Sequence, residues 1–146
     1  MKILVINGPN LNLLGLREPD VYGMATYDDL TSYIQKTANE LDISVKIVQT
    51  NHEGDIVDHI QQAFGRFDAI ILNPAAYTHT SIAILDALKA VPVPAVEVHL
   101  SDIYEREAFR HVSYPSAACV KSIVGKGFLG YGEALAFLKE YVSNIK

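Results

Sequence analysis

The sequence predicts an α/β fold in which five parallel strands form one sheet with helices on both faces. Short apolar runs rich in β-branched residues alternate along the chain with segments whose apolar residues recur at helical spacing. The connections between successive runs are long enough for the right-handed crossovers that parallel strands require. Several runs end abruptly in polar, turn-rich segments, as strands do at the ligand-binding edge of an open α/β sheet.

The first half of the chain predicts three strands and two helices. The run ILVI at 3–6 is apolar throughout, as expected for a strand that is buried on both faces. Thr26 fits the N-cap of the first helix because Asp29 stands three residues later, and apolar residues then recur at helical spacing as far as Leu41. The remaining elements are a second strand at 43–50, a second helix at 56–64 and a third strand at 68–73.

The second half of the chain continues this alternation. A polar segment at 74–81 opens a helix over 82–88, and the stretch 104–111 has room for one or two helical turns. The other elements are strands at 95–98 and 120–124 and a closing helix at 131–145. Because the chain has no internal repeat, low-complexity segment or linker, we expect one domain over residues 1–146. The most economical arrangement is a flavodoxin-like three-layer sandwich with strand order 2-1-3-4-5.

The composition favours a compact soluble protein. The 146 residues are 49% hydrophobic and 20% charged with a net charge of −5, which argues against disorder and against the basic face that nucleic-acid binding needs. Cys119 is the only cysteine, so neither an internal disulfide nor a thiolate zinc site can form, and we expect it to pack as a small apolar residue. The sequence shows no secretory leader pattern and no apolar run of membrane-spanning length, and we expect a cytoplasmic protein with no membrane partner.

Polar side chains gather in three segments that follow predicted strands, at 10–22, 73–81 and 97–110. The carboxyl ends of parallel strands lie on one edge of a sheet, so these segments should meet at one cleft. They carry two imidazoles, three guanidiniums, one phenol and two amides: His79, His99, Arg17, Arg106, Arg110, Tyr22, Asn10 and Asn73. This set suits a small anionic, polyhydroxylated substrate and a proton-transfer reaction.

Each of these residues also has an ordinary structural interpretation. A tyrosine such as Tyr22 is often a partly buried loop aromatic, and His79 could help to cap the helix that follows it. His99 could be a strand-end histidine that pairs with Glu97.

The arginines of the third segment have a similar alternative. Arg106 and Arg110 stand four residues apart, as on a solvated helix face. Glu105 and Glu107 would then be their partners.

One glycine motif points to a different function. Residues 125–130 read GKGFLG, a G-x-G-x-x-G between a predicted strand and a predicted helix, which is the pattern of dinucleotide-binding turns. Only sixteen residues follow the motif, which leaves no room for the second strand and its ribose-binding acid. We therefore interpret these glycines as places where the last helix packs closely on the sheet.

Two other function classes remain open at this point. A flavodoxin-like binding module for a nucleotide or a flavin could use the same cleft without catalysis, although it gives no reason for Tyr22 and Arg17 to share a loop. A hydrolase could use Ser101 or Ser81 with one of the histidines, although neither serine stands in a nucleophile elbow.

Five segments of the chain together resemble type II 3-dehydroquinate dehydratase, the dehydroquinase of the shikimate pathway. They are NGPNLNLLGLREPDVYG (7–23), NHEGDIVDHI (51–60), LNPAAYTHTSIAILDAL (72–88), VEVHLSDIYEREAFRHVSY (96–114) and IVGKGFLGY (123–131). The resemblance implies a flavodoxin-like fold and a homododecamer built as a tetramer of trimers. It also implies that 3-dehydroquinate loses water to give 3-dehydroshikimate, through an enolate and without a cofactor.

The resemblance assigns roles in forming the enolate. The base of the family matches Tyr22, and the activating arginine on its lid loop matches Arg17. The residues that hold a water beside the enolate match Asn10 and Asn73. A free tyrosine has a pKa of about 10 and is a poor base at neutral pH, which explains why arginines would crowd this tyrosine.

The resemblance also assigns the acid and the substrate contacts. The general acid matches His99, and Glu97 matches the carboxylate that orients it. The other matched positions, all implied to lie at the substrate, are His79, Asp86, Leu100, Ser101, Arg106 and Arg110. The family's counterpart of Asp86 reaches into the site of a neighbouring subunit.

Three positions depart from the family pattern. Asp102 stands where asparagine is usual and puts a carboxylate beside the segment implied to bind the substrate's own carboxylate. Ala75 stands where glycine is common, and Lys121 stands where a glycine often lies in the last strand. We expect Asp102 to bear on substrate affinity rather than on the type of reaction.

Overall fold

The structure is a computed structural model that describes residues 1–16 and 18–146 and, for residues 21 and 22, the backbone alone. Within these residues five parallel strands form one sheet in the order β2-β1-β3-β4-β5, as predicted. The strands are β1 (Lys2–Asn7), β2 (Ser44–Gln49), β3 (Ala69–Asn73), β4 (Ala95–His99) and β5 (Lys121–Val124). Each strand begins and ends within one residue of its predicted bounds.

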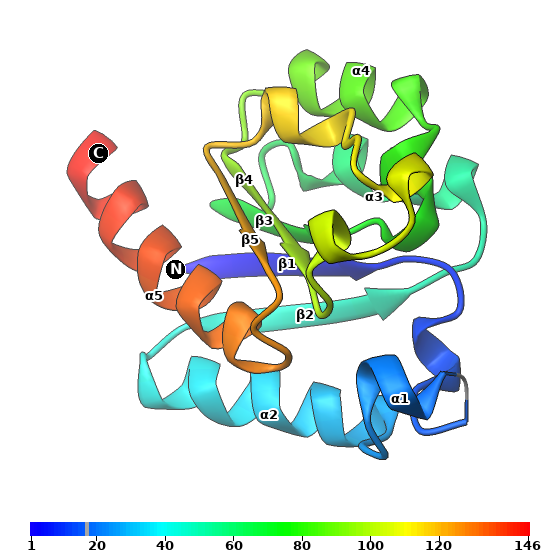
Figure 1. Cartoon of the computed structure of the whole chain (residues 1–146). Coiled ribbons are helices and arrows are strands. Elements are labelled where there is room, and N and C mark those ends of the chain that lie inside the picture. Colours follow the sequence, from blue (N-terminus) through cyan, green and yellow to red (C-terminus); the bar gives the residue numbers. More distant parts are fainter. Residues whose placement is uncertain (17) are drawn as a thin grey trace.

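Helices cover both faces of this sheet and make it the middle of three layers (Figure 1). Helices α2 (Tyr27–Glu40) and α5 (Leu129–Ile145) pack on one face, whereas α3 (Glu53–Ala63) and α4 (Ile82–Ala90) pack on the other. A short helix, α1 (Pro19–Tyr22), lies between β1 and α2 in the chain. The flavodoxin-like three-layer prediction is therefore confirmed. No helix in the described part of the chain is both long and apolar enough to cross a bilayer.

Two apolar cores hold the three layers together. Ile3 and Val5 of β1 join the core under α2 and α5, whereas Leu4 and Ile6 join the core under α3 and α4. Successive side chains of a strand point to opposite faces, so a strand between two helical layers is buried on both sides. This is why the first run of the sequence is continuously apolar instead of alternating.

Two helices begin at side chains that cap them. Thr26 and Asp29 form a capping box, in which the Asp29 N–H donates to Thr26 Oγ1 at 3.2 Å and the Thr26 N–H donates to Asp29 Oδ2 at 2.9 Å. Helix α4 is capped by Ser81, whose Oγ accepts from the Ile84 N–H at 2.9 Å. The capping alternative for His79 is therefore wrong. Buried Ser81 is occupied as a cap, which removes one of the two serines considered as nucleophiles.

Short 3-10 helices fill connections for which the sequence predicts no regular structure. They lie at Leu11–Leu13, Ala75–His79 and Pro115–Ala118. Two more, at Ile103–Glu105 and Ala108–Arg110, provide the helical turns expected over 104–111. The unpredicted turns contain too few residues for hydrophobic periodicity to reveal them.

The G-x-G-x-x-G motif serves helix packing, as predicted. A Cβ atom on Gly130 would lie 3.3 Å from Val98 Cγ1 and 3.4 Å from Ile123 Cγ2, so the start of α5 rests directly on β4 and β5. Gly125 and Gly127 have φ values of 75° and 56°, a region of backbone conformation that glycine enters without strain.

Cys119 lies half-buried against the core under α3 and α4. Burial, with a smaller effect from the negative charge of Glu97, raises the pKa of the Cys119 thiol to about 12. The thiol is therefore protonated at neutral pH and packs as an apolar group, as the sequence predicts.

The loops after β1 and β3 touch through their backbones. The Gly8 N–H donates to the Asn73 carbonyl at 2.8 Å. A Cβ atom on Gly8 would lie only 2.7 Å from the Pro74 carbonyl oxygen, so a side chain there would push the two loops apart. The close approach matters because Asn10 follows in the first loop and Asn73 ends β3.

We expect Gly8→Ala to lower the free energy of unfolding by about 2 kcal/mol, because the added methyl group overpacks two backbone segments. Gly54→Ala is a matched control, since a Cβ atom there meets no atom within 4 Å. Gly54 lies in α3, where alanine is favoured over glycine by up to about 1 kcal/mol. Urea denaturation measures both changes, and a Gly8→Ala protein as stable as the parent chain would contradict the close approach.

Candidate active site

A cleft opens at the carboxyl edge of the sheet, where β1, β3 and β4 end. It encloses about 470 Å³, part of which is open to solvent. Eight residues singled out in the sequence line it: Asn10, Asn73, His79, His99, Leu100, Ser101, Arg106 and Arg110. The three polar segments therefore meet at one site, as the parallel topology requires.

The other four predicted residues are placed differently. Glu97 is buried directly behind His99. Asp86 is exposed on α4 and does not line the cleft of its own chain. Arg17 and the side chain of Tyr22 lie outside the described residues, so their predicted roles stay predictions.

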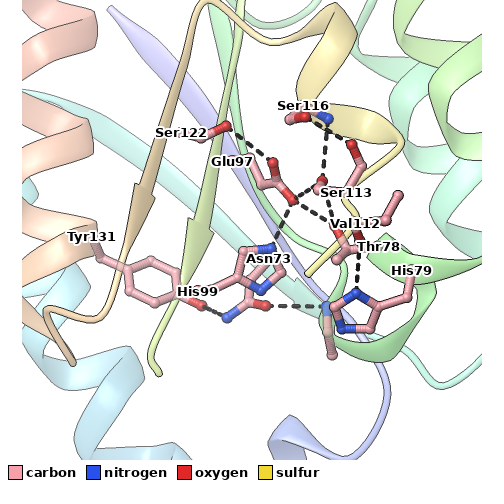
Figure 2. Close-up of polar contacts among 11 residues, drawn as sticks. Asn73, Thr78, His79, Glu97, His99, Val112, Ser113, Ser116, Ser122 and Tyr131 are labelled. Carbon is pink, nitrogen blue, oxygen red and sulfur yellow. Dashed lines mark hydrogen bonds and ion pairs between the residues drawn. The ribbon is translucent and has the colours of Figure 1, made fainter. Parts of the chain in front are cut away.

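The site contains a buried carboxylate, Glu97, of which 1% is exposed. Its Oε1 atom lies 2.7 Å from Nε2 of His99 (Figure 2). Both residues belong to β4, and side chains two residues apart on a strand point to the same face. The pairing of His99 with Glu97 that the sequence suggests is therefore present.

Three hydroxyl groups complete the surroundings of Glu97. Thr78 Oγ1 and Ser113 Oγ each donate to Oε1 at 2.5 Å, and Ser122 Oγ donates to Oε2 at 3.1 Å (Figure 2). Burial by itself raises the pKa of Glu97, but the hydrogen bond and charge of His99, with the two hydroxyls on Oε1, outweigh burial and lower this pKa to about 2. Glu97 is therefore ionised at neutral pH.

The ionised carboxylate determines which nitrogen of His99 carries hydrogen. A carboxylate can only accept hydrogen bonds, so Nε2 of His99 must be the N–H that points to Glu97. Nδ1 is then the nitrogen left for the cleft that His99 lines.

His79 has the opposite tautomer. Its Nδ1 atom lies 2.8 Å from the Val112 carbonyl oxygen, which can only accept, so Nδ1 is the N–H and Nε2 of the neutral ring is an acceptor. Burial and the nearby positive charges of His99 and Arg110 lower the pKa of His79, although the Val112 carbonyl opposes this. His79 is therefore neutral at pH 7 and can accept a hydrogen bond in the cleft.

The two asparagines of the cleft are held by hydrogen bonds, Asn73 through its side-chain amide and Asn10 through its backbone. Asn73 Oδ1 accepts from the Ala75 N–H at 3.1 Å, and Asn73 Nδ2 donates to the Tyr131 hydroxyl at 2.9 Å. The Asn10 N–H donates to Asn51 Oδ1 at 3.1 Å. Asn10 has a φ of 69°, in the left-handed region that asparagine tolerates better than most residues.

The two arginines that line the cleft each meet a carboxylate. Arg110 Nε donates to Glu107 Oε2 at 2.5 Å, and Arg106 Nη2 lies 3.4 Å from Glu18 Oε2. The pairing of Arg110 with Glu107 suggested by the sequence is therefore present. The two guanidiniums do not form a solvated helix face, because both line the cleft. Arg106 follows the 3-10 turn at Ile103–Glu105, and Arg110 ends the separate turn at Ala108–Arg110.

The carbonyl groups after β4 are held by the glycine motif. The Gly125 N–H lies 3.2 Å from the His99 carbonyl and 3.1 Å from the Ser101 carbonyl, and the Gly127 N–H donates to the Leu100 carbonyl at 3.1 Å. Besides packing α5, these glycines therefore support the backbone of three cleft residues.

Two of the three departures from the family pattern make identifiable contacts, and the third stands at a strained backbone position. Asp102 Oδ1 accepts from the Tyr104 N–H at 2.9 Å and caps the turn that follows it. Ala75 has a φ of 51°, which is the backbone conformation that glycine adopts most easily. The ammonium group of Lys121 lies over the Phe137 ring, 4.9 Å from its centroid.

The strand order defines the flavodoxin-like α/β class, and the imidazoles and guanidiniums that line the cleft at its carboxyl edge are of the kinds that enzymes use for proton transfer and anion binding. Known proteins narrow this class further. The family profile described as dehydroquinase class II matches residues 1–139. The 3-dehydroquinate dehydratases of Clostridium acetobutylicum and Caldicellulosiruptor bescii are 48% and 54% identical to this chain, over 98% and 95% of its length and 99% and 97% of theirs.

Solved structures agree with these relatives. The type II dehydroquinase from Butyrivibrio crossotus has a TM-score of 0.93 and 48% identity, covering 95% of this chain and 97% of that one. The enzyme from Propionibacterium acnes has a TM-score of 0.91 and 44% identity, covering 95% and 96%. The chain belongs to the class II dehydroquinase family, as its sequence predicts.

The sequence does not reveal the groups whose hydrogen bonds support Asn73 and Glu97. These groups are Asn7, Thr78, Ser113, Ser122 and Tyr131. One signal was available: a glutamate inside an otherwise apolar strand needs hydrogen-bond donors when the strand is buried. Which donors supply them depends on contacts between distant segments, which no local pattern shows.

We expect the stability of the protein to fall in acid partly through Glu97. A lowered folded-state pKa stabilises the fold above the unfolded value of 4.5, and this contribution is lost as pH falls toward the folded value of about 2. Between pH 6 and pH 3 the loss from this one group is about 2 kcal/mol. Urea denaturation of the parent chain and of Glu97→Gln at both pH values measures it, since the variant lacks the titrating group. If the free energy of unfolding fell equally with pH in both proteins, the lowered pKa of Glu97 would be contradicted.

Proposed function

We propose that this chain removes water from 3-dehydroquinate to give 3-dehydroshikimate, through an enolate and without a cofactor. The observation that carries the proposal is the buried Glu97–His99 pair at the edge of the cleft. The chain is a member of a family whose relatives are named 3-dehydroquinate dehydratase, and such a hydro-lyase needs an acid for the departing hydroxyl.

In this proposal Tyr22 is the base that removes the proton from the carbon next to the ketone. A free tyrosine has a pKa of about 10, so a phenolate at pH 7 requires about 4 kcal/mol of differential stabilisation. Arg17 and Arg106 are proposed to supply it, because a nearby positive charge favours a phenolate. Support for Tyr22 and Arg17 comes from the family resemblance, and support for Arg106 also comes from its place in the cleft.

His99 is the proposed general acid. When its ring is doubly protonated, the Nε2 N–H stays on Glu97 and the Nδ1 N–H faces the cleft. The electrons of the enolate form the new double bond, the carbon–oxygen bond breaks, and the proton from His99 leaves with the hydroxyl as water. The hydrogen bond to Glu97 holds the orientation of the ring.

The remaining lining residues suit the substrate's polar groups. Asn10 and Asn73 are proposed to hold the water beside the enolate oxygen. Neutral His79 offers a hydrogen-bond acceptor to a substrate hydroxyl. The substrate's carboxylate and other hydroxyls are assigned to Arg110, to the Ser101 hydroxyl and to the backbone N–H groups of Leu100 and Ser101.

The assembly belongs to the proposal as well. The family resemblance supports a homododecamer arranged as a tetramer of trimers, in which Asp86 completes the site of a neighbouring subunit. The exposed position of Asp86 on α4, away from its own cleft, is compatible with this role. Cytoplasmic location remains a prediction from the sequence.

Tyr22→Phe is expected to lower turnover at least about a thousandfold, because the phenolate that takes the proton is gone. Substrate binding should change little, since the ring and the other contacts stay. The assay follows the conjugated enone of the product by absorbance, in chelator and with no added cofactor, and calorimetry measures binding. Tyr141→Phe is the control, because Tyr141 stacks on Phe137 and does not line the cleft. Appreciable turnover by Tyr22→Phe would remove Tyr22 as the base.

The shared site predicts complementation between two inactive chains. Asp86→Ala and Tyr22→Phe should each be impaired alone. After the two are unfolded together and reassembled in equal amounts, about one quarter of the sites combine an intact Tyr22 with an intact neighbouring Asp86. Turnover should therefore rise above that of either variant, provided that Asp86→Ala alone keeps less than about one third of the parent turnover. No rise in verified mixed assemblies would contradict the contribution of Asp86 across subunits.

A further inference from the structure

A chain of hydrogen bonds links the candidate active site to the start of α5. Tyr131 is fully buried, and it lies between Asn73 and Asn7, which are partners in the register of β1 and β3. Asn73 Nδ2 donates to the Tyr131 hydroxyl at 2.9 Å, and this hydroxyl donates to Asn7 Oδ1 at 2.6 Å. Figure 2 shows the Tyr131 hydroxyl and the Asn73 amide pointing toward one another.

A backbone group sets the direction of every bond in this chain. The Ala75 N–H can only donate, so the Asn73 atom that it meets at 3.1 Å must be Oδ1. Nδ2 of Asn73 therefore faces Tyr131, which must accept. The single hydroxyl proton is left for Asn7, whose own Nδ2 faces the Tyr27 hydroxyl at 3.4 Å.

These contacts leave part of the Asn73 amide for the cleft. Tyr131 uses one N–H of Nδ2 and Ala75 uses one lone pair of Oδ1, so one N–H and one lone pair of Asn73 remain. An amide without these two partners could turn over and exchange its donor for its acceptor. With both partners in place, the same donor always faces the same part of the cleft that Asn73 lines.

We propose that Tyr131 is a positioning residue for the dehydration reaction, because its hydroxyl, together with the Ala75 N–H, holds the Asn73 amide in the one orientation that the active site uses. The inference rests on the proposed function, in which Asn73 holds the water beside the enolate. Tyr131 itself does not reach the substrate, because it is fully buried. Burial, partly opposed by the hydrogen bond from Asn73, raises the pKa of Tyr131, so the phenol stays protonated and is no second base.

Removing only the hydroxyl tests the proposal. Tyr131→Phe should lower kcat about tenfold, which is less than the loss expected when a catalytic donor itself is removed. The KM for 3-dehydroquinate should change less than about twofold, because the other substrate contacts remain. Tyr33→Phe is the matched control. The Tyr33 hydroxyl lies against Gly132, which follows Tyr131 in α5, but it does not belong to the hydrogen bonds that lead to Asn73. An unchanged kcat in Tyr131→Phe would overturn the proposal.

A double-mutant cycle separates positioning from general damage. Asn73→Ala should lower kcat more than Tyr131→Phe does. Adding Tyr131→Phe to Asn73→Ala should then lower kcat less than about twofold further, because no amide is left to orient. The same tenfold loss in both backgrounds would show that Tyr131 acts independently of Asn73 and would overturn the proposal.

Unfolding of the same four proteins keeps the inference separate from the proposed function. The losses in stability from Tyr131→Phe and Asn73→Ala should not add, because the two residues share one hydrogen bond. If the parent chain does not turn over 3-dehydroquinate, the proposed function is contradicted. If the stability losses of Tyr131→Phe and Asn73→Ala add, the contact between Tyr131 and Asn73 is overturned, whether or not the chain is active. Where Tyr131→Phe does not fold, Asn7→Ala takes its place in the kinetic cycle alone, because without Asn7 the Tyr131 proton is free to turn toward Asn73.

Discussion

The carboxylate of Glu97 carries a negative charge at a position where 1% of the residue is exposed. An ion removed from water in this way costs several kcal/mol unless donors replace the water. His99, Thr78, Ser113 and Ser122 are those donors, and they come from β4, from the turn after β3, from the loop after Arg110 and from β5. The charge therefore joins four segments at the edge of the sheet, and moving any one of them would leave the carboxylate poorly solvated.

The loop at 112–114 couples this carboxylate to the second imidazole. The Val112 carbonyl holds the N–H of His79, and the neighbouring Ser113 hydroxyl holds Glu97, which in turn holds the N–H of His99. The Tyr114 N–H donates to the Thr78 carbonyl at 2.9 Å and closes the loop onto the same turn. One short loop thus supports the contacts that give the two histidines opposite tautomers. Each neutral ring leaves one acceptor nitrogen, Nε2 of His79 and Nδ1 of His99, and the His99 nitrogen becomes a donor only when that ring is doubly protonated.

The two faces of the sheet contribute different groups to the same cleft. Glu97 and His99 share one face of β4, whereas Asn73 turns toward Tyr131 of α5 on the other face. Successive side chains of a strand alternate between faces, so polar residues at the ends of parallel strands can be supported from both helical layers. The Glu97–His99 pair and the Asn73 amide are in this way held by hydrogen bonds from opposite sides of the sheet.

The sequence by itself determined the layers, the strand bounds and the segments that meet at the cleft, because burial on two faces, capping and parallel topology leave local patterns. Thr26 and Asp29 are one such pattern, and the structure realises it as a capping box. Only the tertiary structure decided that Ser113 and Ser122 hold Glu97. A serine has the same local signature in a surface turn as in a buried network, and its partner here lies 16 or 25 residues away, so its role exists only once the segments pack together.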